Sequence, residues 1–179
     1  IGAPLGPSLP LLRHTFATLR RTGFKAVYYY SLPWDSCGVH NYLAAKLMWN
    51  AEADVDALFE EWLDRAYGPG APAMARLYRL LDRELEAYKR AAPKASQDYE
   101  MSSDLAVAVY LKQFATLESL YREACAGAAT DAQRRRLAAF GDNLLILHHV
   151  FQEAGLLADA EQSVFYRSPE AYRAFLAGN

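Results

Sequence analysis

Tyr29, Trp34, Asp35, His40 and Asn41 lie close together in the sequence and have the side chains that proteins use to hold sugars. An aromatic face packs against a sugar ring, while carboxylate and amide groups hydrogen-bond to its hydroxyls. This group therefore predicts a carbohydrate-binding site. A structural alternative stays open, in which Tyr29 and Trp34 are core aromatics while Asp35 and His40 organise a turn and the start of a helix.

Other reactive side chains give weaker signals. Cys37 lies three residues before His40, but catalytic Cys–His pairs are usually assembled from distant segments. His148 and His149 are adjacent, so on a helix their side chains point about 100° apart and do not readily share one metal ion. The cysteines, Cys37 and Cys125, lack metal-ligand spacing. We therefore predict no metal site and no cofactor.

The charge and hydropathy pattern excludes several kinds of partner. The chain has 179 residues, with 19 basic and 21 acidic side chains and a net charge of −2. That charge is too small to favour nucleic acid, and no apolar run approaches the ~20 residues that cross a membrane. The chain opens on Ile1 with neither an initiator Met nor a signal peptide. We therefore expect a piece of a longer protein, of unknown localisation, that binds neither nucleic acid nor membrane.

The elements that carry the candidate site form a helix–strand–helix unit. A helix capped by Ser8 precedes a strand over Phe24–Leu32, which is rich in Val and Tyr. A polar loop over Trp34–His40 follows. The next predicted helix, Asn41–Asn50, is apolar on nearly every side and is therefore expected to be buried.

The predicted strand needs a sheet, because a single strand leaves its backbone N–H and C=O groups unpaired. Within the chain, the one candidate partner is a short segment around Val164–Tyr166. We therefore expect Phe24–Leu32 to pair with strands upstream of Ile1.

The rest of the chain is predicted to be helical. Long amphipathic patterns joined by short connections favour an antiparallel helical bundle over roughly Asp54–Leu157. The predicted helix starts are Asp54, Pro72, Ser103, a Thr130–Gln133 capping box and, for a last short helix, Ser168–Pro169. The predicted fold class is mainly α: a helical bundle preceded by one helix–strand–helix unit.

The order helix, strand, polar loop, buried helix is the unit from which (β/α)₈ barrels are assembled. Three runs carry a more specific resemblance: Asn41–Asn50 (NYLAAKLMWN), Asp54–Trp62 (DVDALFEEW) and Tyr67–Gly68. They resemble the segment after the last barrel strand in an uncharacterised bacterial family with a glycoside-hydrolase-like barrel, and more loosely that of the α-glucuronidases. The resemblance implies a barrel end over 1–53, a helical C-terminal domain over 54–179, and the remainder of the barrel as partner.

Glycosidases usually need two carboxylates about the scissile bond. The resemblance implies that one comes from a middle strand, which this chain lacks. Where the family pattern has a Glu after the last strand, this chain reads Tyr28–Asp35 (YYYSLPWD), which argues against an acid/base role there. The resemblance implies that the chain is the C-terminal fragment of a carbohydrate-active, glycoside-hydrolase-like protein, in which it supplies the rim of a cleft and a helical accessory domain. The fragment is expected to be inactive alone, and its catalytic residues are unknown. The alternative is a non-catalytic helical interaction or packing module, whose aromatic side chains all lie in the core.

Overall fold

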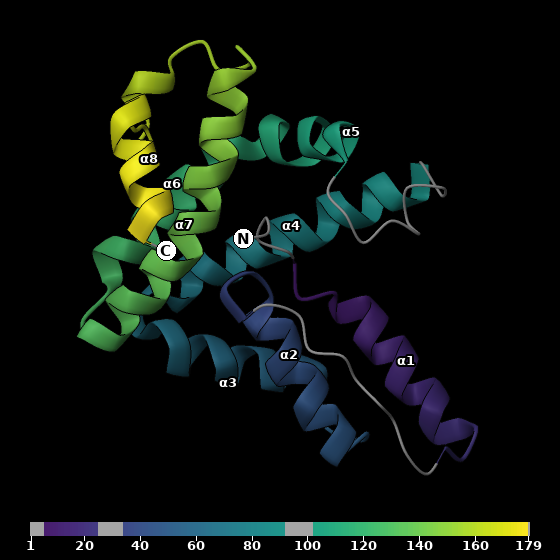
Figure 1. Ribbon diagram of the computed structural model, residues 1–179. Coiled ribbons are helices and arrows are strands. Elements are labelled where there is room, and N and C mark those ends of the chain that lie inside the picture. Colours follow the sequence, from purple (N-terminus) through teal and green to yellow (C-terminus); the bar gives the residue numbers. More distant parts are fainter. Residues whose placement is uncertain (1–5, 25–33, 92–101, 179) are drawn as a thin grey trace.

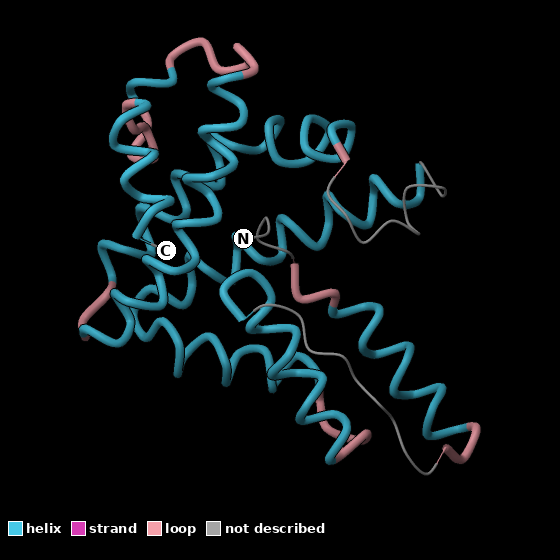
Figure 2. The backbone as a smooth tube through the Cα atoms, in the orientation of Figure 1, coloured by secondary structure: helices cyan, strands magenta, loops and turns pink. Residues whose placement is uncertain are grey.

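A computed structural model describes residues 6–24, 34–91 and 102–178, and these residues form helices joined by turns (Figures 1 and 2). In chain order the elements are α1 (Leu9–Arg21), α2 (Trp34–Trp49), α3 (Val55–Tyr67), the short turn η1 (Gly68–Gly70), α4 (Ala71–Ala91), α5 (Ser103–Leu105), the π-helical η3 (Ala106–Leu111), α6 (Lys112–Gly127), α7 (Asp131–Glu153), the short turn η4 (Ala160–Gln162) and α8 (Pro169–Gly178). The mainly α prediction is confirmed.

The predicted helix–strand–helix unit is only partly visible. Its strand, Phe24–Leu32, lies outside the described residues except for Phe24, as does the connection over 92–101. No strand occurs within the three described ranges. The candidate strand partner Val164–Tyr166 is a turn instead, with Tyr166 N–H donating to the Ser163 carbonyl oxygen at 3.1 Å. Phe165 is buried in it, against Phe114 and Tyr121.

Helices α3, α4, α6 and α7 pack on one another around a common apolar core. The residues at its centre have no exposed surface, and they lie on the predicted apolar stripes: Phe59, Leu63, Leu77, Leu117 and Leu144. The same core continues onto α1 and α2 through Phe16 and Leu43. It therefore crosses the predicted domain boundary at residues 53 and 54, and the division itself stays a prediction.

Two predicted helix starts are confirmed in atomic detail. The Asp54 carboxylate accepts hydrogen bonds from the backbone N–H groups of Asp56 at 2.8 Å and Ala57 at 3.2 Å. In the capping box, Gln133 N–H donates to Thr130 Oγ1 at 3.2 Å, and Thr130 N–H donates to Gln133 Oε1 at 3.1 Å. Both caps satisfy orphan amides with side chains from the same turn.

Helix α2 differs from its prediction in two respects. It begins at Trp34, so the expected loop Trp34–His40 is helical, with a kink at Cys37 where φ is −128° and ψ is 15°. It is also buried on one side only, because α1, α3 and α7 pack on that side. Its last turn leaves Trp49 94% exposed and Met48 40% exposed.

The fourth long helix also departs from a regular pattern. Its cap is Ser102 rather than Ser103, since Leu105 N–H donates to Ser102 Oγ at 3.2 Å. The π-helical turns of η3 hold more residues per turn than an α-helix, which rotates the following side chains. As a result Val109 is buried, whereas Val107, which a regular α-helical repeat would place on the apolar side with Tyr110, Phe114 and Leu117, is 46% exposed.

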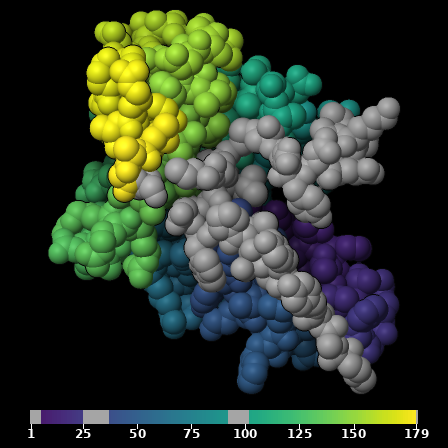
Figure 3. Space-filling model, in the orientation of Figure 1, coloured from purple at the N-terminus to yellow at the C-terminus, as the bar shows by residue number. Residues whose placement is uncertain are grey.

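Helices α1 and α2 run parallel, side by side at one end of the molecule, with α8 at the other (Figures 1 and 3). Just before α1 begins and just after the kink of α2, His40 Nδ1 lies 2.9 Å from the carbonyl oxygen of Pro7. At their C-terminal ends, Arg20 forms an ion pair with Glu52 at 3.3 Å. Consecutive parallel helices cannot be joined by a tight turn, and successive helices of a (β/α) barrel have this relation.

Candidate functional site

The structure places four of the five predicted sugar-binding residues on α2. Tyr29 lies outside the described residues, and Trp34 and Asp35 begin the helix with side chains that are also outside them. His40 is half-buried with its ring against Pro7, and Asn41 is 3% exposed. Convergence of these side chains on a ligand stays a prediction.

Asp82 of α4 lies beside this region and was not identified from the sequence. Its Oδ1 accepts from Ser8 N–H at 2.7 Å and its Oδ2 from Leu9 N–H at 3.0 Å. The predicted cap Ser8 makes no side-chain cap bond and has a left-handed backbone with φ of 57°. Helix α1 is therefore capped by α4. In the sequence, Asp82 is visible only as an acidic residue directly after the buried Leu81. The residues that it caps, Leu9 and Ser8, lie 73 and 74 positions away.

The environment of Asp82 also changes its ionisation. Burial raises the pKa of this carboxyl above its ordinary value, although its hydrogen bonds to Leu9 and Ser8 and the nearby His40 and Arg13 oppose the shift. Asp82 thus links the start of α1 to His40 electrostatically.

Asp82→Ala is expected to destabilise the protein by about 1–2 kcal/mol at neutral pH, the usual cost of removing an N-terminal helix cap. Chemical denaturation monitored by circular dichroism measures this difference. Asp64→Ala is a matched control, because Asp64 is exposed on α3, and it should change the free energy of unfolding by less than about 0.5 kcal/mol. Equal effects of the two substitutions would contradict a capping role.

The raised pKa of Asp82 predicts a pH dependence of stability. Because the folded pKa lies above the ordinary value of 3.8, the stabilising contribution is complete below that value and is lost as the pH rises through the folded pKa. The natural chain and the Asp82→Asn variant are compared by their free energies of unfolding. The advantage of the natural chain over the variant should therefore decline as the pH rises from 3.8. A pH-independent difference would show that burial does not control this carboxyl.

Cys37 and the core tyrosines form a buried polar cluster. Cys37 is 3% exposed and interacts electrostatically with Tyr78 and Tyr110. The hydroxyls of Tyr67 and Tyr78 are 3.0 Å apart, and burial raises the pKa of Tyr67 to about 12. Burial keeps these tyrosines protonated near neutral pH, and the burial of Cys37 among them argues against Cys37 as a nucleophile.

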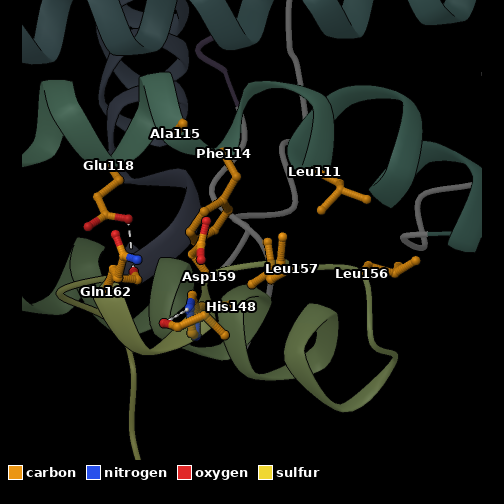
Figure 4. Close-up of a pocket in the computed structure, with 12 residues that line it drawn as sticks. Leu111, Phe114, Ala115, Glu118, His148, Leu156, Leu157, Asp159 and Gln162 are labelled. Atoms are coloured by element: carbon orange, nitrogen blue, oxygen red, sulfur yellow. Dashed lines mark hydrogen bonds between the residues drawn. The ribbon is translucent and has the colours of Figure 1, made fainter.

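A separate pocket lies between the start of α6 and the turns that follow α7 (Figure 4). Its volume is about 450 Å³, within the range of small-molecule sites. Leu111, Phe114 and Leu157 contribute apolar walls, and His148 and Asp159 contribute polar groups. No predicted site residue lines it.

His148 is held in one orientation at this pocket. It is 1% exposed, and its Nε2 donates to the carbonyl oxygen of Ala160 at 3.1 Å. Burial lowers the pKa of His148 below its ordinary value, so the ring is neutral at pH 7. Its Nδ1 is then a buried acceptor, and it has no hydrogen-bond partner within the described part of the chain.

Glu118 fixes the opposite wall. Its carboxylate accepts from Ser163 Oγ at 2.8 Å and from Val164 N–H at 2.9 Å. These bonds tie the segment before α8 to α6 at this edge of the pocket. Within the described ranges, no group of three or more His, Cys, Asp or Glu side chains is placed to hold a metal ion.

Comparison with known proteins gives one match. A family model described as a domain of unknown function, DUF4838, matches residues 5–79, which include α1, α2, α3 and the first part of α4. None of the curated proteins and none of the solved structures compared with the chain matches it. Among the described helices, none has the length and apolar character needed to cross a membrane.

Proposed function

We propose that this chain is the C-terminal part of a carbohydrate-active, glycoside-hydrolase-like protein. It contributes the rim of a cleft and a helical accessory domain, and it does not hydrolyse glycosides alone. The observation that carries the proposal is the parallel packing of α1 and α2, the relation of successive helices in a (β/α) barrel. The family match over residues 5–79 covers the same two helices.

The exposed side of α2 supports the barrel as partner. Trp49 and Met48 lie adjacent on its last turn, and Trp49 is almost wholly solvent-exposed. The exposed side of the last two turns also carries Ala45 and Lys46, so the apolar part of it is centred on Met48 and Trp49. A preceding barrel unit packed against α2 would cover this side and remove a tryptophan from water.

A binding experiment on the chain extended upstream tests the proposed rim. Neutral and acidic oligosaccharides are titrated by calorimetry, and Trp34→Ala should weaken binding about tenfold or more, as expected for loss of an aromatic anchor. Val150→Ala is the control, because Val150 is 52% exposed on α7, and it should leave affinity unchanged. Saturable binding that Trp34→Ala does not affect would place the sugar elsewhere.

The alternative function is a non-catalytic helical interaction or packing module. The buried pair Tyr67 and Tyr78 favours it, because their hydroxyls hydrogen-bond to each other and their rings pack in the core. These two tyrosines therefore have a structural role. The upstream reading frame separates the two functions. Preceding strand–helix units with carboxylates at the strand ends support the barrel, whereas an unrelated upstream region supports the module.

A further inference from the structure

We propose that the pocket between α6 and the turns after α7 binds a small organic ammonium ion with an apolar body, such as an alkylamine or arylamine. This site is separate from the proposed sugar-binding rim, because its walls come from η3, α6, α7 and the turns after α7 and include none of the rim residues. It does not depend on the function proposed above.

The first argument is that the charged groups at the pocket are acceptors, while Gln162 contributes an amide that both donates and accepts. The Asp159 carboxylate lines it, and the Glu118 carboxylate lies at its edge, already bonded to Ser163 and Val164. None of the described residues that line it is Lys or Arg. A ligand that fits these groups donates hydrogen bonds and carries positive charge.

The second argument is the unpaired acceptor on His148. Because Nε2 donates to the Ala160 carbonyl, Nδ1 carries a lone pair. A buried acceptor without a partner is destabilising, and an ammonium N–H would satisfy it. Arg167 acts on His148 from nearby, but its Nη1 donates to the carbonyl oxygens of Val164 at 3.1 Å and Tyr166 at 2.6 Å.

The third argument is the apolar lining. Leu111 and Leu157 provide aliphatic walls, and the ring of Phe114 can interact with a cation through its π face (Figure 4). Leu111 is the last residue of η3, and π-helical turns are frequent at functional sites. The site therefore combines space for an apolar body with acceptors for a cationic head.

The test uses benzylammonium as the probe, with benzyl alcohol and benzoate as ligands of similar size. Binding is followed by NMR of ¹⁵N-labelled protein, including the imidazole nitrogens of His148. We expect saturable binding of benzylammonium that shifts the Nδ1 resonance of His148 and weakens as salt is added. Absence of saturable binding, or equal binding of benzoate, would overturn the proposal.

Two variants locate the bound cation. Asp159→Asn should weaken benzylammonium binding about threefold to fivefold, the range for a partly exposed ion pair. Glu161→Gln is the control, because Glu161 is exposed in the same turn and does not line the pocket. Equal effects of these two substitutions would refute a specific contact with Asp159.

Ala115→Phe fills the pocket from an exposed position on α6. It should abolish binding of benzylammonium while leaving the melting temperature nearly unchanged, since no core side chain is altered. Retained binding in this variant would place the amine outside the pocket.

Discussion

Gly70→Ala is expected to destabilise the protein by about 2–3 kcal/mol, because a side chain at this position has no space. A Cβ on Gly70 would lie 2.6 Å from the carbonyl oxygen of Ala124 and 3.3 Å from its carbonyl carbon. Both are backbone atoms of α6, so they cannot move aside as a flexible side chain would. The α3–α4 corner would have to separate from α6.

Thermal or denaturant unfolding measures this effect, and Gly178→Ala provides the same substitution in open space. Among the described residues, no atom beyond the neighbouring residues and backbone of its own helix lies within 4 Å of a Cβ at Gly178, so its replacement should change the free energy of unfolding by less than about 1 kcal/mol. Gly127→Ala should also be costly, because its Cβ would lie 2.9 Å from the backbone nitrogen of Gly70. Similar stabilities for Gly70→Ala and Gly178→Ala would show that the corner is loosely packed.

Phe59→Ala is expected to cost about 3–5 kcal/mol, since it leaves a cavity at the centre of the core. The Phe59 ring has no exposed surface, meets the ring of Tyr78 edge-on at 6.2 Å, and lies 5.5 Å from the Arg79 guanidinium. Such a loss is a large fraction of the ~5–15 kcal/mol that stabilises a typical domain. Denaturant unfolding of the two proteins side by side measures it.

Phe24→Ala is the matched control, because Phe24 is 67% exposed. Its replacement should change stability by less than about 1 kcal/mol in this chain. A cost for Phe24 equal to that for Phe59 would mean that Phe24 is covered in solution, contrary to its exposure in the structure.

The features that sequence reasoning predicted well are those decided within a few residues. Asp54 and the Thr130–Gln133 pair cap helices through amides in the same turn, so their patterns contain the whole interaction. The apolar stripe of α3 is likewise complete in its own sequence, and Phe59 and Leu63 are buried as its spacing indicates.

The errors arise where distant residues or irregular geometry decide the outcome. The role of Asp82 depends on residues 73 and 74 positions away, which no local pattern relates to it. The π-helical η3 changes the number of residues per turn, so a fixed spacing selects Val107 instead of Val109. Trp49 was expected to be buried because its helix is apolar on nearly every side. An apolar pattern does not show whether another element packs on each of those sides, and Trp49 is 94% exposed.

The candidate sites show the same limit. The rim residues were selected because aromatic and polar side chains are close together in the sequence, and a resemblance to known proteins pointed to the same stretch. The pocket at His148 was not predicted, because its walls come from η3, α6, α7 and the turns after α7 and include ordinary core types such as Leu111 and Phe114. His148 itself was considered only as a metal ligand.

The cap that Asp82 supplies to α1 has a consequence for the order of folding. Helix α1 has 13 residues, close to the ~12–15 below which isolated helices are marginal in water, and no side-chain cap of its own. It gains its N-terminal cap only after α4 has formed and docked. During synthesis α1 leaves the ribosome before α4, yet it becomes stable only once residues beyond Asp82 have emerged.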